Sequence, residues 1–131
     1  MQNELLHWLG LIVIVTALLW LPYILNSFVV RGIMETMGYS EDVPPLSPWA
    51  ARAKKAHYNA VENLVLFGPI LVAHAFASDE ATGKAVATAA MVYLIARILH
   101  YIVYILAIPV ARTLAFAGGW VATLYAAFLF L

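Results

Sequence analysis

Four polar residues with a helical spacing lie near the middle of the chain. Arg52, Lys55, Asn59 and Glu62 follow one another at steps of 3, 4 and 3 residues, which places their side chains on one face of an α-helix. Guanidinium and ammonium groups bind carboxylates, and a guanidinium can do so with two parallel hydrogen bonds. This helix face therefore carries the groups needed to bind a small ligand with carboxylates.

A second polar set follows farther along the chain. Arg97, His100 and Tyr104 are separated by steps of 3 and 4 residues, so these side chains also share one face of a helix. What the two sets can do depends on where the helices lie, because a charge costs much more inside a membrane than in water.

The composition favours a membrane location for both helices. Of the 131 residues, 65% are hydrophobic and 11% are charged, against about 45–50% and about 25% in soluble domains. A soluble monomer of this length needs more polar surface, since folding buries only about two thirds of its area. With 7 basic and 7 acidic residues, the chain has no basic excess for binding nucleic acid. It has no cysteine, which excludes disulfides and a thiol nucleophile of its own, and we predict no metal site.

Four apolar segments are long enough to cross a bilayer, which takes about 20 residues. We predict an all-α integral membrane bundle of four transmembrane helices in one domain, residues 1–131, with helices over about 5–31, 48–77, 81–107 and 110–131. Pro22 predicts a kink in the first helix, because proline lacks a backbone N–H. Ser47 followed by Pro48 is typical of a helix start. The glycines and prolines of residues 31–47 indicate a loop.

The distribution of charge predicts how the bundle is oriented. Four spans place both termini on one side, together with a short loop where Lys84 lies near Asp79 and Glu80. Five of the seven basic residues lie toward the opposite side: Arg31, Arg52, Lys54, Lys55 and Arg112. Because basic residues concentrate on the cytoplasmic side of membrane proteins, we expect that side to be cytoplasmic and both termini to lie outside the cytoplasm.

Two charges lie deep within the predicted spans. At about 1.5 Å of rise per residue, Glu62 lies about 20 Å from Pro48 and Arg97 about 15 Å from Ala107, so their depths match. Ionisable groups at such depth cost about 3 kcal/mol or more each, and an unpaired buried charge is strongly destabilising. We therefore predict a buried ion pair between Glu62 and Arg97, so that Glu62→Gln should destabilise the fold.

Two explanations of the polar residues are compatible with the sequence. Interhelical hydrogen bonds hold helices together in membranes, and cations near the membrane surface can extend to lipid headgroups. Alternatively, Arg52, Lys55 and Arg112 join Tyr104 to bring several donors to one membrane level. That arrangement suits a small ligand with several carboxylates that enters from the cytoplasm.

The helix motifs together resemble those of the MAPEG family, the membrane-associated proteins of eicosanoid and glutathione metabolism. Residues 52–62 are similar to the family's second-helix signature, in which a basic residue is followed by Asn and then by Glu. Residues 97–104 are similar to the family's Arg-x-x-His-x-x-x-Tyr. Arg112-Thr113 resembles the basic residue and hydroxyl that open the fourth helix, and Arg31 falls where the family keeps an arginine.

The resemblance implies a left-handed four-helix bundle that forms a homotrimer, with glutathione between neighbouring subunits near the cytoplasmic face. Enzymatic members use an arginine at the Arg112 position to stabilise the glutathione thiolate, which is the nucleophilic form, and Tyr104 would orient the sulfur or donate to it. The residues implied in glutathione binding are Arg31, Arg52, Lys55, Asn59, Glu62, Arg97, His100 and Tyr104. The chain looks like a bacterial-type member, which implies the bacterial inner membrane.

Three positions depart from the family's pattern. Lys55 stands where the family usually has arginine, so a two-bonded fork is replaced by a point charge. Tyr58 stands where some members carry another arginine, and Thr113 replaces a serine of one branch. These departures bear on the ligand more than on the fold.

Two classes of function follow. The first is a glutathione transferase or peroxidase that takes glutathione from the cytoplasm and a lipophilic electrophile from the membrane lipid, with Arg112 as the electrostatic catalyst. The alternative is a non-catalytic membrane protein of the same family, either a lipid- or thiol-binding module or a trimeric scaffold. Arg112 favours the enzyme, because a non-catalytic branch of the family lacks this arginine.

Overall fold

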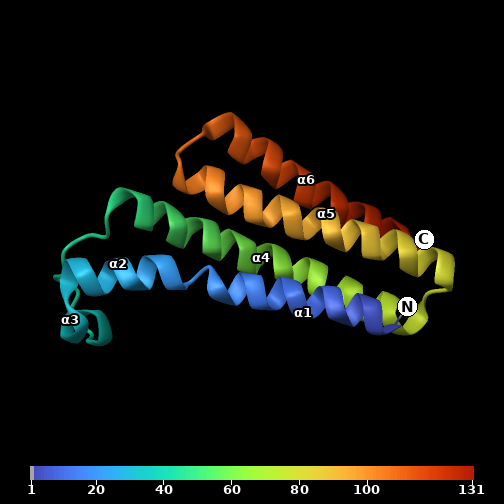
Figure 1. Ribbon diagram of the computed structural model, residues 1–131, viewed down its shortest axis with the longest axis horizontal. Helices are drawn as coiled ribbons and strands as arrows, with labels where there is room; N and C mark the ends of the chain where they lie inside the picture. Colours follow the sequence, from blue (N-terminus) through green and yellow to red (C-terminus); the bar gives the residue numbers. More distant parts are fainter. Residues whose placement is uncertain (1) are drawn as a thin grey trace.

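The computed structural model describes residues 2–131, and the regular elements within that range are all helices. They are α1 (Gln2–Leu18), α2 (Leu21–Arg31), α3 (Ile33–Met37), α4 (Pro48–Ala77), α5 (Glu80–Ile105) and α6 (Pro109–Phe128). α1 and α2 form one long rod, beside which α4, α5 and α6 run back and forth as an elongated bundle (Figure 1).

The long helices match the dimensions of a bilayer. The stretch from α1 through α2 (Gln2–Arg31), α4 and α5 are each long and apolar enough to cross a membrane. α6 has 20 residues, and at about 1.5 Å per residue it is as long as the hydrocarbon core is thick. Both termini lie at the end where α4 joins α5, with α3 and the α5–α6 turn at the other end (Figure 1). The chain is a multi-pass integral membrane protein, and the predicted four-helix bundle is confirmed.

The predicted kink in the first span is confirmed as a break between α1 and α2. α1 ends at Leu18, and Pro22 lies in the first turn of α2, where its missing N–H does no harm. The break leaves backbone groups outside the helical ladder at membrane depth. Tyr101 of α5 compensates in part, since its hydroxyl donates to the Leu19 carbonyl oxygen at 3.0 Å.

The segment that follows α2 contains a short helix, where the sequence predicts only a loop. Gly32 adopts φ 83°, a left-handed conformation open to glycine, and so reverses the chain directly into α3. The hydroxyls of Ser27 and Thr36 then lie 3.0 Å apart and hold α3 against α2. The prediction was wrong here because α3 has only five residues, too few to show a helical period.

The start of α4 agrees with the predicted start at Pro48, but the interaction that stabilises it differs. Ser47 is the N-cap residue, and its side chain makes no capping hydrogen bond. Instead the amide of Asn26 holds it: Asn26 Nδ2 donates to Ser47 Oγ at 2.9 Å, and the Ser47 N–H donates to Asn26 Oδ1 at 3.0 Å. This pair joins α2 to the first turn of α4.

Small residues let the helices approach closely. Ala50, Ala53, Ala56 and Ala60 recur every three or four residues on α4 and are buried, as expected for helix contacts in membranes, where small side chains bring backbones together. This apolar stripe borders the polar face of α4. Its packing therefore decides which polar side chains meet across the bundle.

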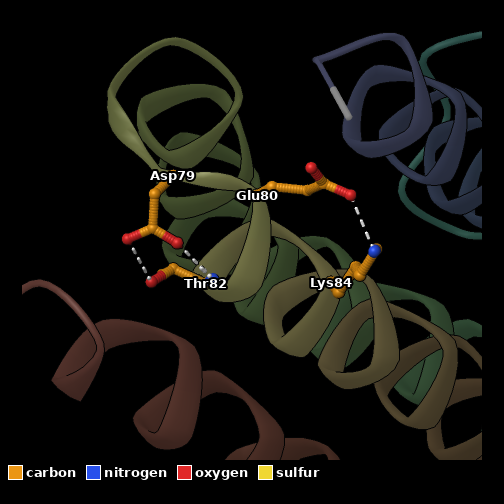
Figure 2. A network of polar contacts seen from close by, with 4 residues as sticks. All are labelled: Asp79, Glu80, Thr82 and Lys84. Carbon is orange, nitrogen blue, oxygen red and sulfur yellow. Dashed lines mark hydrogen bonds and ion pairs between the residues drawn. The ribbon is translucent and has the colours of Figure 1, made fainter.

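The connection between α4 and α5 ends in an acidic helix start. Asp79 is the N-cap residue of α5, and its carboxylate accepts from the Thr82 N–H at 2.9 Å and from the Thr82 hydroxyl at 3.1 Å (Figure 2). Lys84 Nζ lies 2.7 Å from Glu80 Oε1, one turn away on the same helix (Figure 2). Both contacts are exposed to water and mark the end of the bundle where the termini lie.

We expect the Asp79 cap to appear in the pH dependence of stability. The hydrogen bond from the Thr82 N–H lowers the pKa of the Asp79 carboxyl from its ordinary value of 3.8. The cap therefore stabilises the fold above that value and is lost as the pH falls through the lower folded-state pKa. Asp79→Asn keeps a capping oxygen without a proton to take up. In thermal denaturation in detergent, the wild-type Tm should fall more steeply than that of Asp79→Asn below about pH 4; parallel curves would contradict the assignment.

Candidate functional site

A polar cleft of about 460 Å³ opens between α4, α5 and α6. Its size falls in the range of small-molecule sites. It unites the two helix faces predicted from the sequence and adds the first turns of α6. Its lining residues are Lys55, Tyr58, Asn59, Glu62, His100, Tyr104, Arg112, Thr113 and Phe116.

The α5–α6 turn brings Arg112 to this cleft. Ala107 adopts φ 60°, so the chain reverses within a few residues, and Pro109 starts α6 in its first turn. Arg112 then lies one turn inside α6, with its guanidinium carbon 5.0 Å from the centre of the Tyr104 ring. A cation over an aromatic face is attracted by the ring quadrupole. This contact holds an exposed guanidinium beside a phenol at the mouth of the cleft.

His100 forms the inner wall of the cleft. Its ring is nearly buried, with 3% of its surface exposed. It meets the Tyr104 ring edge to face at 5.4 Å and the Phe116 ring at 6.2 Å between centroids. These aromatic contacts come from α5 itself and from α6, so His100 links the two helices behind Arg112.

The predicted ion pair between Glu62 and Arg97 is wrong. Arg97 donates instead to Asn59 Oδ1 at 3.2 Å and to the Phe116 carbonyl oxygen at 3.0 Å. Glu62 is exposed, and the one ion pair in the described part of the chain joins Lys84 to Glu80. Depth along two helices does not determine rotation about them. Arg97 lies between Asn59 of α4 and the carbonyl oxygens of α6, which accept from its two terminal nitrogens in place of a carboxylate.

Arg52 and Arg31 do not line the cleft. Arg52 lies in an adjoining hollow of about 170 Å³ that shares Tyr104 and Arg112 with the cleft, and its Nε donates to the Ile105 carbonyl oxygen at 2.8 Å. Arg31 ends α2, where its Nε donates to the Pro44 carbonyl oxygen at 2.7 Å. The structure thus brings six of the predicted residues into one cleft, with Arg52 beside it, Arg97 behind it and Arg31 outside it.

The chain matches the MAPEG family over residues 5–131, which is nearly its whole length. The chain belongs to the MAPEG family. Comparisons with curated proteins and with solved structures found no match. MAPEG proteins are membrane proteins of glutathione-related transfer and peroxide chemistry, so the resemblance seen in the two helix motifs is confirmed at the level of the family.

The MAPEG motifs account for most of the cleft but not for all of it. Phe116 also lines it, although the sequence did not single it out. The spacing could have identified it, since Phe116 follows Arg112 by one helical turn and so lies on the same face of the helix. Tyr58 and Thr113, noted as departures from the family's pattern, both line the cleft as well. Within residues 2–131, no group of three or more His, Cys, Asp or Glu side chains is placed to hold a metal ion.

The corrected contacts reverse the expected effect of Glu62→Gln in this MAPEG protein. Because Glu62 is exposed and has no ionic partner in residues 2–131, Glu62→Gln should change the free energy of unfolding by less than about 0.5 kcal/mol. Arg97→Gln removes buried hydrogen bonds between helices and should lower it by about 1–3 kcal/mol. Thermal denaturation of both variants in detergent tests this. Equal losses of stability in the two variants would instead support an ion pair between Glu62 and Arg97.

Proposed function

We propose that this MAPEG protein is a glutathione-dependent transferase or peroxidase that acts on lipophilic electrophiles dissolved in the membrane. The observation that carries the proposal is the charge pattern of the cleft. Lys55 and Arg112 supply cations, and Glu62 supplies a carboxylate that has no ionic partner among residues 2–131. Glutathione carries two carboxylates and one ammonium group, so each of its charged groups finds an opposite charge in the cleft.

Arg112 is the residue that we assign to the chemistry. A thiol beside a guanidinium ionises more readily, and the thiolate is the attacking form. In a transfer reaction, the sulfur forms a bond to the electrophilic carbon, and the leaving group departs with the electrons of the broken bond. Tyr104, whose ring lies 5.0 Å from the Arg112 guanidinium carbon, can donate its hydroxyl proton to a sulfur or leaving group held at Arg112.

The surroundings of Arg112 support a second substrate that comes from lipid. A shallow hollow at the start of α6 is lined by Arg112 and Thr113 together with Val110 and Leu114, and these two apolar side chains are 70% and 68% exposed. In a membrane-spanning helix, exposed apolar side chains face acyl chains. A lipophilic molecule can therefore approach Arg112 from the bilayer while glutathione occupies the polar cleft.

A homotrimer is part of the proposal. The cleft lies open on one side of the chain, and Arg31 does not reach it from its own α2. If Arg31 binds glutathione, it does so in the cleft of a neighbouring subunit. This arrangement agrees with glutathione bound between subunits, as the family implies.

The catalytic assignment predicts a specific loss in Arg112→Ala. Calorimetry in mild detergent should show saturable glutathione binding to the wild type. The ultraviolet spectrum of the complex should show a thiolate absorbance near neutral pH. Arg112→Ala should lose that absorbance and lower kcat for conjugation of an electrophile by about 10²–10³-fold. Glu62→Gln should weaken binding of glutathione without removing the thiolate signal.

Three results would contradict the proposal. A folded wild-type protein that binds no glutathione at millimolar concentration would exclude this co-substrate. Binding without a thiolate signal, or full conjugation rates in Arg112→Ala, would instead favour a non-catalytic family member that binds a lipid or thiol.

We also propose that the cations at the α2–α3 end face the cytoplasm of a bacterial inner membrane. Arg31 ends α2, and Arg52 and Arg112 lie in the first turns of α4 and α6; these helix ends lie opposite both termini (Figure 1). By the positive-inside rule, reporters fused to the C-terminus should be active if they require the periplasm and inactive if they require the cytoplasm. The reverse pattern would overturn this orientation.

A further inference from the structure

We propose that Arg97 is a positioning residue: it fixes the Asn59 amide so that the NH₂ group of Asn59 is directed into the cleft. Gly119 leaves the space that the Arg97 guanidinium needs for this contact. The geometry is independent of the ligand; only the identity of the ligand in the test rests on the proposed function.

Arg97 lies behind the cleft rather than in it. Its side chain is 3% exposed, and its two terminal nitrogens reach in different directions. Nη1 donates to Asn59 Oδ1 on α4 at 3.2 Å, and Nη2 donates to the Phe116 carbonyl oxygen on α6 at 3.0 Å. The guanidinium carbon also lies 5.6 Å and 5.3 Å from the centres of the Tyr93 and Phe116 rings. One side chain on α5 thereby connects α5 to both α4 and α6.

The chemistry of arginine decides which way the Asn59 amide points. A guanidinium has donors and no acceptor and remains charged, so the atom of Asn59 that it contacts must be the carbonyl oxygen. Asn63 Nδ2 lies 3.4 Å from the same oxygen, which agrees with this assignment. The NH₂ group of Asn59 must then point away from Arg97. It has no hydrogen-bond partner among residues 2–131, and Asn59 lines the cleft.

Gly119 provides the space for this contact. A Cβ atom built at Gly119 would lie 2.5 to 2.9 Å from Nη2, Nε and Cζ of Arg97, closer than real side chains approach. A Cβ at the adjacent Gly118 would meet the Ala96 Cβ at an ordinary 3.7 Å. The two glycines therefore differ: Ala is tolerated at 118, whereas at 119 it must displace the guanidinium.

Stability alone does not explain a buried guanidinium here. Arg97 has no carboxylate partner in the described residues, and its Nε is buried without a hydrogen-bond partner. Replacing buried charges by apolar side chains of similar volume is often neutral or stabilising. Orienting Asn59 gives the Arg97 guanidinium a function, because the two N–H donors of the Asn59 side-chain amide are then held at a fixed point in the cleft. The ligand must offer an acceptor oxygen there, either a carbonyl or a carboxylate.

The test compares Gly119→Ala with Gly118→Ala, two variants that add one methyl group at neighbouring positions of α6. Calorimetry with glutathione should give a wild-type Kd for Gly118→Ala and a Kd about tenfold weaker for Gly119→Ala, which corresponds to the loss of about one hydrogen bond to the ligand. In an Asn59→Ala background, adding Gly119→Ala should weaken binding no further. A merely structural effect of the methyl group would persist in that background.

Wild-type binding in Gly119→Ala, or an undiminished effect of Gly119→Ala beside Asn59→Ala, would overturn the proposal. If Gly119→Ala does not fold, Arg97→Lys takes its place. This variant keeps the charge but replaces the planar fork, whose two nitrogens reach Asn59 and Phe116 separately, by a single nitrogen. The same weakening and the same dependence on Asn59 are therefore expected.

A ligand-free measurement separates this proposal from the proposed function. Asn59→Asp places a carboxylate against Arg97 and should raise the Tm at neutral pH, because a buried charge gains a partner. In Gly119→Ala, where the guanidinium is displaced, that rise should disappear. If wild-type protein binds no glutathione, the glutathione assignment fails while this comparison still decides the role of Arg97. Equal rises in both backgrounds would refute that role.

Discussion

Arg97 holds a charge inside a membrane bundle, and the rest of the site follows from the contacts that its guanidinium makes. Its guanidinium reaches Asn59 on α4 and the Phe116 carbonyl on α6. These contacts set the distance between the three helices at the depth of the cleft. Lipid offers no competing hydrogen bonds, so the arrangement holds only while all three helices stay in place.

Small residues make this arrangement possible. Ala50, Ala53 and Ala56 of α4 pack in one cluster with Tyr23 of α2 and Tyr101 of α5, and Gly119 leaves room for the guanidinium. On the other side of the cleft, the tight turn at Ala107 and the proline that starts α6 place Arg112 above Tyr104. A buried cation, Arg97, thus lies behind the cleft, and two exposed cations, Lys55 and Arg112, line it.

This division explains how a chain without cysteine can support thiol chemistry. Under the proposed function, the nucleophile comes with the co-substrate, and the protein supplies positioned charges and donors. Lys55, Glu62 and Arg112 remain free of ion pairs within the described residues, so their charges are available to the ligand. Val110 and Leu114 are exposed apolar side chains beside Arg112. In the proposed reaction they would let a lipophilic substrate reach the cleft from the membrane.

The sequence by itself determined the helices, the break at Pro22, the start of α4 and the two polar helix faces, because apolar length, proline and residue spacing act within one segment. It also identified six of the residues that line the cleft. It could not determine the partner of Arg97, the short helix α3 or the place of Phe116. Matching depths suggested Glu62 for Arg97, but the rotation of each helix about its axis is decided only when alanine and glycine faces pack together. Only the tertiary structure could therefore turn Arg97 toward Asn59 and α6, and leave Glu62 free in the cleft.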